Sequence, residues 1–77
     1  MTDKKISEFI CKWIFNQTSI KIHDSDDIFL IGKLDSLLFA ELIAAVEFQF
    51  GVYVDFTEIQ DWEQIKTPVG LSGIIAT

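Results

Sequence analysis

The segment from Ser36 to Phe50 constrains the fold more than any other part of the sequence. Its fifteen residues contain neither glycine nor proline, and Gly51 follows at the position where many helices end. At 100° per residue, five apolar side chains of this segment share one side: Phe39, Leu42, Ile43, Val46 and Phe50. The sequence therefore predicts a helix of about four turns whose inner stripe faces a hydrophobic core.

One further helix is expected before this segment in the sequence and another after it. Five apolar residues near the N-terminus recur at helical spacing: Ile6, Phe9, Ile10, Trp13 and Ile14. They predict a first helix over residues 3–16, which Thr2 or Asp3 can cap. Thr67-Pro68 supplies a cap followed by a proline at the first helical position, which predicts a last helix that ends near Ala76.

The remaining segment completes the fold prediction. Residues 52–56 are expected to be extended, and a helical turn with Thr57 as its cap is expected over residues 57–61. The fold class is therefore all-α, a small four-helix bundle of three main helices and one short helix. A chain of 77 residues has no room for a second core, so residues 1–77 are predicted to form a single domain.

Residues 17–35 lose the helical periodicity and form a long connection. Ordered loops of this length are usually functional or fixed to the core. Four consecutive apolar residues are expected to fix this one: Ile28, Phe29, Leu30 and Ile31. Gly32 is expected to permit a turn before the next helix. The acidic run at residues 24–27 does not fit a calcium loop, because Ile28 stands where the fifth position requires an oxygen ligand. A solvated run of charges is favoured over loose surface binding of a divalent ion, so no metal site is predicted.

Charge and composition exclude several classes of protein. Twelve acidic and six basic residues give a formal net charge of −6 and a pI of about 4.4. A nucleic acid partner would require a basic patch, and the six basic residues of this acidic sequence are dispersed. Protein partners with basic docking surfaces are favoured instead. No apolar run has the length of a membrane span and the N-terminal segment does not resemble a signal peptide, so we expect a cytoplasmic protein without membrane insertion. We also expect a monomer.

The sequence offers little for catalysis. Cys11 and His23 are the only cysteine and histidine, and a catalytic pair would require the loop to bring His23 to Cys11, on the outer side of the first helix. No serine lies in a nucleophile-elbow pattern. We therefore expect no catalytic residue and no enzyme activity, and a single cysteine excludes an intrachain disulfide.

The most informative stretch is Gly32-Lys33-Leu34-Asp35-Ser36-Leu37, which leads into the central helix. It places a serine hydroxyl at a helix N-terminus, beside unpaired backbone N–H groups and the positive end of the helix dipole. A phosphate ester at this position would be stabilised by both. Taken alone, the Asp35-Ser36 dipeptide is also typical of an ordinary helix cap.

This stretch and the helix after it, Ala-Glu-Leu-Ile-Ala-Ala-Val-Glu-Phe-Gln-Phe-Gly, resemble the phosphopantetheine-attachment region of the acyl carrier protein family. The expected order of helices resembles that family over most of the chain. The resemblance implies 4′-phosphopantetheine on Ser36, between Asp35 and Leu37, attached by a phosphopantetheinyl transferase that uses coenzyme A. It further implies an adenylating or acyl-loading enzyme, which forms a thioester on the arm, and downstream enzymes that remove the acyl or aminoacyl group.

The spacing of the motif bears on the branch of the family. Lys33 and Leu34 separate the glycine from the Asp-Ser pair, whereas typical fatty-acid carriers have one residue there. This spacing, and Trp62 ahead of Thr67-Pro68, resemble discrete aminoacyl and D-alanyl carrier proteins. One alternative is a specialised fatty-acid or polyketide carrier that admits an acyl chain between its helices. Another is a helical adaptor without the arm, against which the intact Asp35-Ser36-Leu37 triplet argues.

The side of the central helix opposite the inner stripe is the expected docking surface for partner enzymes. The resemblance places docking on this side, and six residues are candidates: Leu37, Ala40, Glu41, Ala44, Glu47 and Phe48. Apolar residues flanked by acids suit a partner surface with a hydrophobic pocket and a basic rim. Typical fatty-acid carriers often have glutamate at the position of Phe48. The alternative is that Phe48 packs against the short third element.

Overall fold

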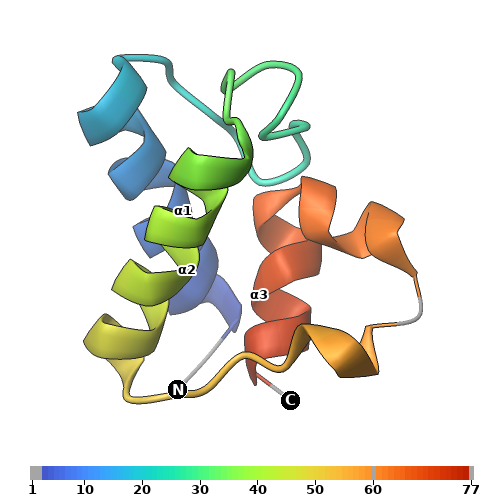
Figure 1. Ribbon diagram of the computed structural model, residues 1–77. Coiled ribbons are helices and arrows are strands. Elements are labelled where there is room, and N and C mark those ends of the chain that lie inside the picture. Colours follow the sequence, from blue (N-terminus) through green and yellow to red (C-terminus); the bar gives the residue numbers. More distant parts are fainter. Residues whose placement is uncertain (1–2, 60, 77) are drawn as a thin grey trace.

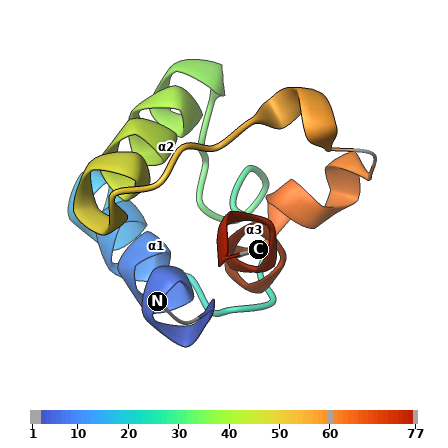
Figure 2. The same cartoon turned by 90° about the horizontal axis from the view of Figure 1, so that it is seen from below.

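The described part of the chain folds into three α-helices and two short 3-10 helices, arranged as in Figure 1. The computed structural model describes residues 3–59 and 61–76, and no β-strand occurs within these ranges. In chain order the elements are α1 (Asp3–Thr18), α2 (Ser36–Phe50), η1 (Phe56–Glu58), η2 (Trp62–Lys66) and α3 (Pro68–Ala76). Figure 2 shows the chain leaving the end of α2, passing through η1 and η2 and returning as α3. The predicted all-α bundle is confirmed, with two 3-10 helices in place of one short helix.

The core is formed by aliphatic side chains from all three α-helices. α1 contacts both α2 and α3, and its three buried isoleucines recur every four residues along one face. Thirteen of the described hydrophobic residues are buried: Ile6, Ile10, Ile14, Ile22, Ile28, Leu34, Leu42, Ile43, Val46, Val54, Ile65, Leu71 and Ile75. Each of the larger ones contributes roughly 1.5–3 kcal/mol by leaving water. Phe9 and Phe50 are half-buried at the edge of this core, where their rings meet edge to face with centroids 5.5 Å apart.

Both ends of α2 lie where the sequence predicts. The Asp35 carboxylate accepts a hydrogen bond from the Leu38 backbone N–H at 2.8 Å, which makes Asp35 the N-cap. Gly51 adopts a left-handed conformation, with φ 66° and ψ 37°, and its N–H donates to the Glu47 carbonyl at 2.9 Å. A side chain at this position would be strained, so glycine ends the helix here.

The outer helices differ slightly from prediction at their ends. Asp3 lies inside the first turn of α1 and does not cap it, while Thr2 lies outside the described residues. α1 continues to Thr18, two residues further than predicted, and the Thr18 hydroxyl donates to a backbone carbonyl one turn earlier at 2.8 Å. The predicted start of α3 is confirmed, because the Thr67 hydroxyl accepts the Gly70 N–H at 3.1 Å.

The segment between α2 and α3 departs further from the sequence expectation. The predicted cap, Thr57, is wrong: the Asp55 carboxylate caps η1 and accepts both the N–H and the hydroxyl of Thr57, at 3.0 and 2.6 Å. These hydrogen bonds lower the pKa of Asp55 below its usual value. The sequence analysis also missed η2, which starts at Asp61 in the same way: that carboxylate accepts the Glu63 N–H at 3.1 Å.

The long loop is fixed to the core by fewer of the predicted residues than expected. Ile28 is fully buried and Phe29 half-buried, but Leu30 is 72% exposed and Ile31 43% exposed. The reason is that residues 27–31 form one helical turn, in which the Ile31 N–H donates to the Asp27 carbonyl at 2.8 Å. Such a turn spreads consecutive side chains around its axis, so four in a row cannot all point inward. Two residues outside the predicted set, Ile22 and Leu34, are buried instead.

Gly32 is required for a different reason from the one expected. A Cβ atom on Gly32 would lie 2.6 Å from the Ile28 carbonyl oxygen, so the residue permits a close backbone approach. The left-handed residue of this turn is Lys33, with φ 61°. A residue with a side chain therefore adopts an uncommon backbone conformation just ahead of α2.

The two neighbours Phe29 and Leu30 should differ sharply in their contribution to stability. The Phe29 ring packs against Phe39 at 5.2 Å between centroids, so Phe29→Ala should lower the free energy of unfolding by about 2–3 kcal/mol, below the range for a fully buried ring. Leu30→Ala removes an exposed side chain and should change it by less than about 0.5 kcal/mol. Urea denaturation of both variants measures the difference, and equal losses would contradict this description of the turn.

Candidate functional site

Ser36 is the first residue of α2, and its side chain is exposed to solvent. The capping role that the sequence left open between Asp35 and Ser36 belongs to Asp35. Within the described residues, no hydrogen bond of the protein engages the Ser36 hydroxyl. The hydroxyl is therefore accessible to another molecule, and changing it leaves the cap of the helix intact.

The environment of this hydroxyl favours a negatively charged group. The first backbone N–H groups of an α-helix have no partner within the helix. In α2, the Asp35 side chain accepts one of these groups, the N–H of Leu38. No acidic residue occupies the first turn of α2, so the Asp35 carboxylate at the cap is the acidic side chain that this hydrogen bond sets against the positive end of the helix dipole. The N–H groups of Ser36 and Leu37 are left by the described residues for a further acceptor. A phosphodiester on Ser36 fits both features.

The predicted docking residues are mostly where the sequence analysis placed them. Leu37, Ala40, Glu41, Ala44 and Phe48 are all exposed on α2. Phe48 is 91% exposed, which excludes the alternative that it packs against the short third element. These five residues form the outer face of α2.

Glu47 differs from the other candidates on this helix. It is half-buried, and its carboxylate accepts the backbone N–H of Val54 at 2.9 Å. This hydrogen bond holds the segment after α2 against the helix. The structure therefore gives the Glu47 carboxylate an internal partner, and the free acid on the outer face is Glu41.

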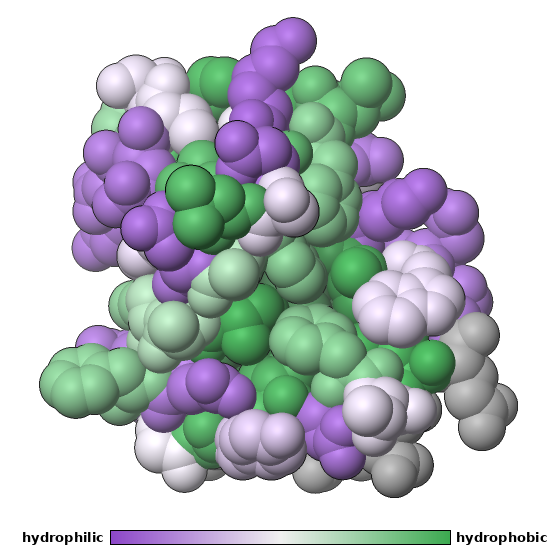
Figure 3. Space-filling model, in the orientation of Figure 1, coloured by the Kyte–Doolittle hydropathy of each residue, from purple (hydrophilic) through white to green (hydrophobic). Residues whose placement is uncertain are grey.

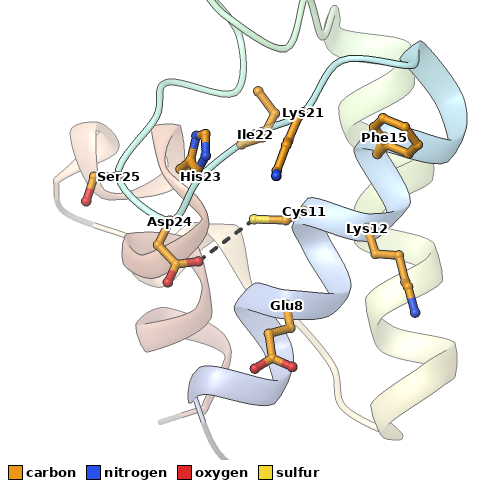
Figure 4. A pocket seen from close by; sticks show the side chains of 9 residues that line it. All are labelled: Glu8, Cys11, Lys12, Phe15, Lys21, Ile22, His23, Asp24 and Ser25. Atoms are coloured by element: carbon orange, nitrogen blue, oxygen red, sulfur yellow. Dashed lines mark hydrogen bonds between the residues drawn. The ribbon is translucent and has the colours of Figure 1, made fainter.

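Cys11, the single cysteine, lies on the side of α1 that faces the loop, and His23, the single histidine, lies on that loop (Figure 4). They line an open hollow of about 840 Å³ together with seven other residues: Glu8, Lys12, Phe15, Lys21, Ile22, Asp24 and Ser25. The Cys11 sulfur lies 3.9 Å from the Asp24 carboxylate, while the His23 ring contacts Asp26 at 3.2 Å. Burial, followed by the negative charges of Asp24 and Asp26, raises the pKa of Cys11 to about 11. The thiol stays protonated at neutral pH and is a poor nucleophile.

Comparison with known proteins identifies the family. A family model described as a phosphopantetheine attachment site matches residues 10–75, which include α2 and the loop before it. The chain belongs to this phosphopantetheine-binding family of carrier proteins. No curated protein and no solved structure gave a match. Carrier domains of this family bear covalently attached 4′-phosphopantetheine, work with a phosphopantetheinyl transferase and acyl-handling enzymes, and are not catalysts themselves.

Membership of the family gives the structural features their context. The carrier has no helix among its described residues that is long and apolar enough to cross a membrane. Its described residues also hold no group of three or more histidine, cysteine or acidic side chains arranged to bind a metal ion.

Sequence analysis missed the exposure of Leu30 and Ile31 in the turn before the motif. The available signal was Asp27, because an aspartate commonly begins such a turn.

Cys11 should be slow to react with thiol reagents while the protein is folded. A pKa of about 11, against 9.0 for an ordinary cysteine, reduces the thiolate fraction at pH 8 about 100-fold. Alkylation of the apo-carrier by iodoacetamide at pH 8 should therefore be at least about tenfold slower than in 8 M urea, as followed by intact mass. Equal rates in the two conditions would show that Cys11 is an ordinary exposed thiol.

Proposed function

We propose that Ser36 bears the phosphopantetheine arm and that the protein carries an aminoacyl or acyl group between enzymes. The observation that supports this most directly is the exposed Ser36 hydroxyl at the start of α2, within the segment matched by the family model. When bound, the arm supplies a thiol that holds the cargo as a thioester. We place this carrier in the cytoplasm, as a monomer.

Attachment of the arm requires little of this chain beyond position and access. The Ser36 oxygen forms a bond to phosphorus, the phosphoanhydride bond of coenzyme A breaks, adenosine 3′,5′-bisphosphate leaves, and the hydroxyl proton passes to a base of the transferase. Asp35 caps the first turn of α2 and so fixes the backbone from which the hydroxyl projects. The unpaired N–H groups of that turn favour the charge of the resulting phosphodiester.

Two features favour a small aminoacyl cargo over a long acyl chain. The motif has the two-residue spacing of Lys33 and Leu34 that resembles discrete aminoacyl carriers. In addition, the Phe39 ring lies between Phe29 and Phe56, with centroid distances of 5.2 and 5.8 Å. These rings fill the inner side of α2 with the protein's own side chains. An adenylating enzyme that activates a carboxylate is the expected source of such a cargo.

The assignment of Ser36 can be tested by mass spectrometry. Ser36→Ala should fold with an unchanged melting temperature, because Asp35 provides the cap, and should gain no phosphopantetheine from coenzyme A and a broad-specificity transferase. Ser25→Ala, which alters another exposed serine, should be modified as fully as the wild type. Modification of Ser36→Ala at the wild-type yield would refute the assignment.

The outer face of α2 should determine how the loading enzyme binds. Glu41→Lys reverses an exposed charge and should slow loading most at low salt, because screening weakens such attraction at physiological ionic strength. Phe48→Glu should weaken the docked complex and raise KM, because it removes an exposed apolar anchor. Aminoacylation rates measured at two salt concentrations distinguish the two effects.

Melting temperatures provide the control for these two variants. Both side chains are exposed, so neither substitution should lower the melting temperature by more than about 3 °C, a shift that corresponds to less than about 1 kcal/mol in a domain of this size. If Phe48→Glu melts early while Glu41→Lys is loaded at the normal rate, the outer face of α2 is not the docking surface.

A further inference from the structure

The turn ahead of the motif presents two aliphatic side chains to solvent. Leu30 and Ile31 are 72% and 43% exposed, and Leu37, on the first turn of α2, is 71% exposed. We call these three residues the loop patch. Single exposed apolar residues are common on protein surfaces. Here three of them are contributed by the segments on both sides of an exposed hydroxyl, that of Ser36.

The loop patch lies close to Ser36 because the loop closes on itself. The Leu34 N–H donates to the Ile28 carbonyl at 3.3 Å, which closes a ring in which Leu30 and Ile31 are exposed while Gly32 is buried. Chain geometry limits the Cα atoms of Ile31 and Ser36 to a separation of about 18 Å at full extension, and the closed ring shortens it. Figure 1 shows the loop and the start of α2 at the same end of the molecule, and Figure 3 shows the mixed polar and apolar surface of the face seen in that orientation.

The backbone beneath the loop patch is held firmly. The Asp27 carboxylate accepts the N–H groups of both Phe29 and Leu30, at 2.9 and 3.0 Å, and the Asp27 carbonyl accepts that of Ile31 at 2.8 Å. Phe29 anchors the same turn to Phe39 of α2. Two exposed aliphatic side chains on an ordered backbone lose little conformational entropy when a partner covers them.

We propose that the phosphopantetheinyl transferase binds the loop patch while it modifies Ser36, an inference that rests on the proposed function. Before the arm exists, the transferase must bring phosphorus within bonding distance of the Ser36 oxygen, so its surface must cover the surroundings of that residue. A standard interface buries about 800 Å² on each partner, equivalent to a disc of about 16 Å radius. The carrier measures only 29 × 23 × 21 Å, so such a disc centred on Ser36 covers most of that end of the molecule.

Chemistry separates the transferase from the other partners. A loading enzyme acts on the thiol at the far end of the arm and does not have to enclose Ser36. The transferase, in contrast, must enclose Ser36 because it acts on the hydroxyl itself. The partner surface that fits is an apolar depression for the two aliphatic side chains of the turn. Asp27 precedes these two residues and Asp35 follows them, and with the carrier's net charge of −6 the two acids favour basic residues on the partner, against the single positive charge of Lys33.

The test compares the Leu30→Ser/Ile31→Ser double variant with Tyr53→Ser. Tyr53 is 83% exposed and follows Gly51 at the far end of α2, roughly 22 Å of helix away from Ser36. The rate of modification by coenzyme A and transferase, followed by intact mass, should fall at least about tenfold in kcat/KM for the double variant and remain at the wild-type value for Tyr53→Ser. Prolonged incubation should still convert the double variant completely.

Several outcomes would overturn the proposal. The proposal is wrong if the double variant is modified at the wild-type rate, or if the rate falls as much for Tyr53→Ser as for the double variant. It is also wrong if attachment is unchanged while the loaded thioester hydrolyses faster, because that result would mean that the loop patch contacts the arm. If the double variant melts early, Leu30→Ser alone replaces it, since Leu30 is the more exposed of the two. Failure of wild-type protein to accept the arm would instead refute the proposed function, so the two failures are distinguishable.

Discussion

The structure depends on the backbone of Ile28, where three parts of the chain meet. Its N–H donates to the Lys66 carbonyl at the end of η2 at 2.7 Å, its carbonyl accepts the Leu34 N–H ahead of α2, and its side chain is fully buried. A second hydrogen bond, from the Val69 N–H to the Asp24 carbonyl at 3.0 Å, joins the same loop to α3. A loop without regular structure must satisfy its buried polar groups somewhere. This loop does so on the C-terminal segment, and thereby fixes the start of α2.

The parts of the fold that the sequence predicts are those set by neighbouring residues. α2 is bounded by the cap at Asp35 and the left-handed Gly51, and α3 begins at Thr67-Pro68. The errors arose where aspartates start short turns. Asp27 begins the turn that exposes Leu30, and Asp55 displaces Thr57 as a cap. Both aspartates act through their side chains on backbone N–H groups two or three residues later, a competition that apolar periodicity does not register.

The candidate site was also predictable only in part. The motif predicts Ser36 as the attachment site, which stays a prediction, and helical periodicity correctly places the exposed outer face of α2. It could not show that the Glu47 carboxylate would turn back to the Val54 N–H, because this contact depends on the path of the chain after the helix ends. Nor could it show that Lys33, rather than Gly32, adopts the left-handed conformation. Non-local packing around Ile28 decides both the close approach at Gly32 and the conformation that follows it.

Asp35 caps α2 while the Ser36 hydroxyl is exposed, and this arrangement has a consequence for the protein in a cell. Because the cap of α2 is supplied by Asp35, esterification of the Ser36 hydroxyl breaks no hydrogen bond that holds the fold together. If Ser36 is the site of modification, as proposed, folding does not depend on the arm, and the helix dipole that favours the phosphodiester charge adds some stability to the modified form. Under that assignment the unmodified chain keeps its capped α2, and a hydrolase that removed the arm would return a folded protein. The pool of carrier can thus be activated and recycled without being synthesised again.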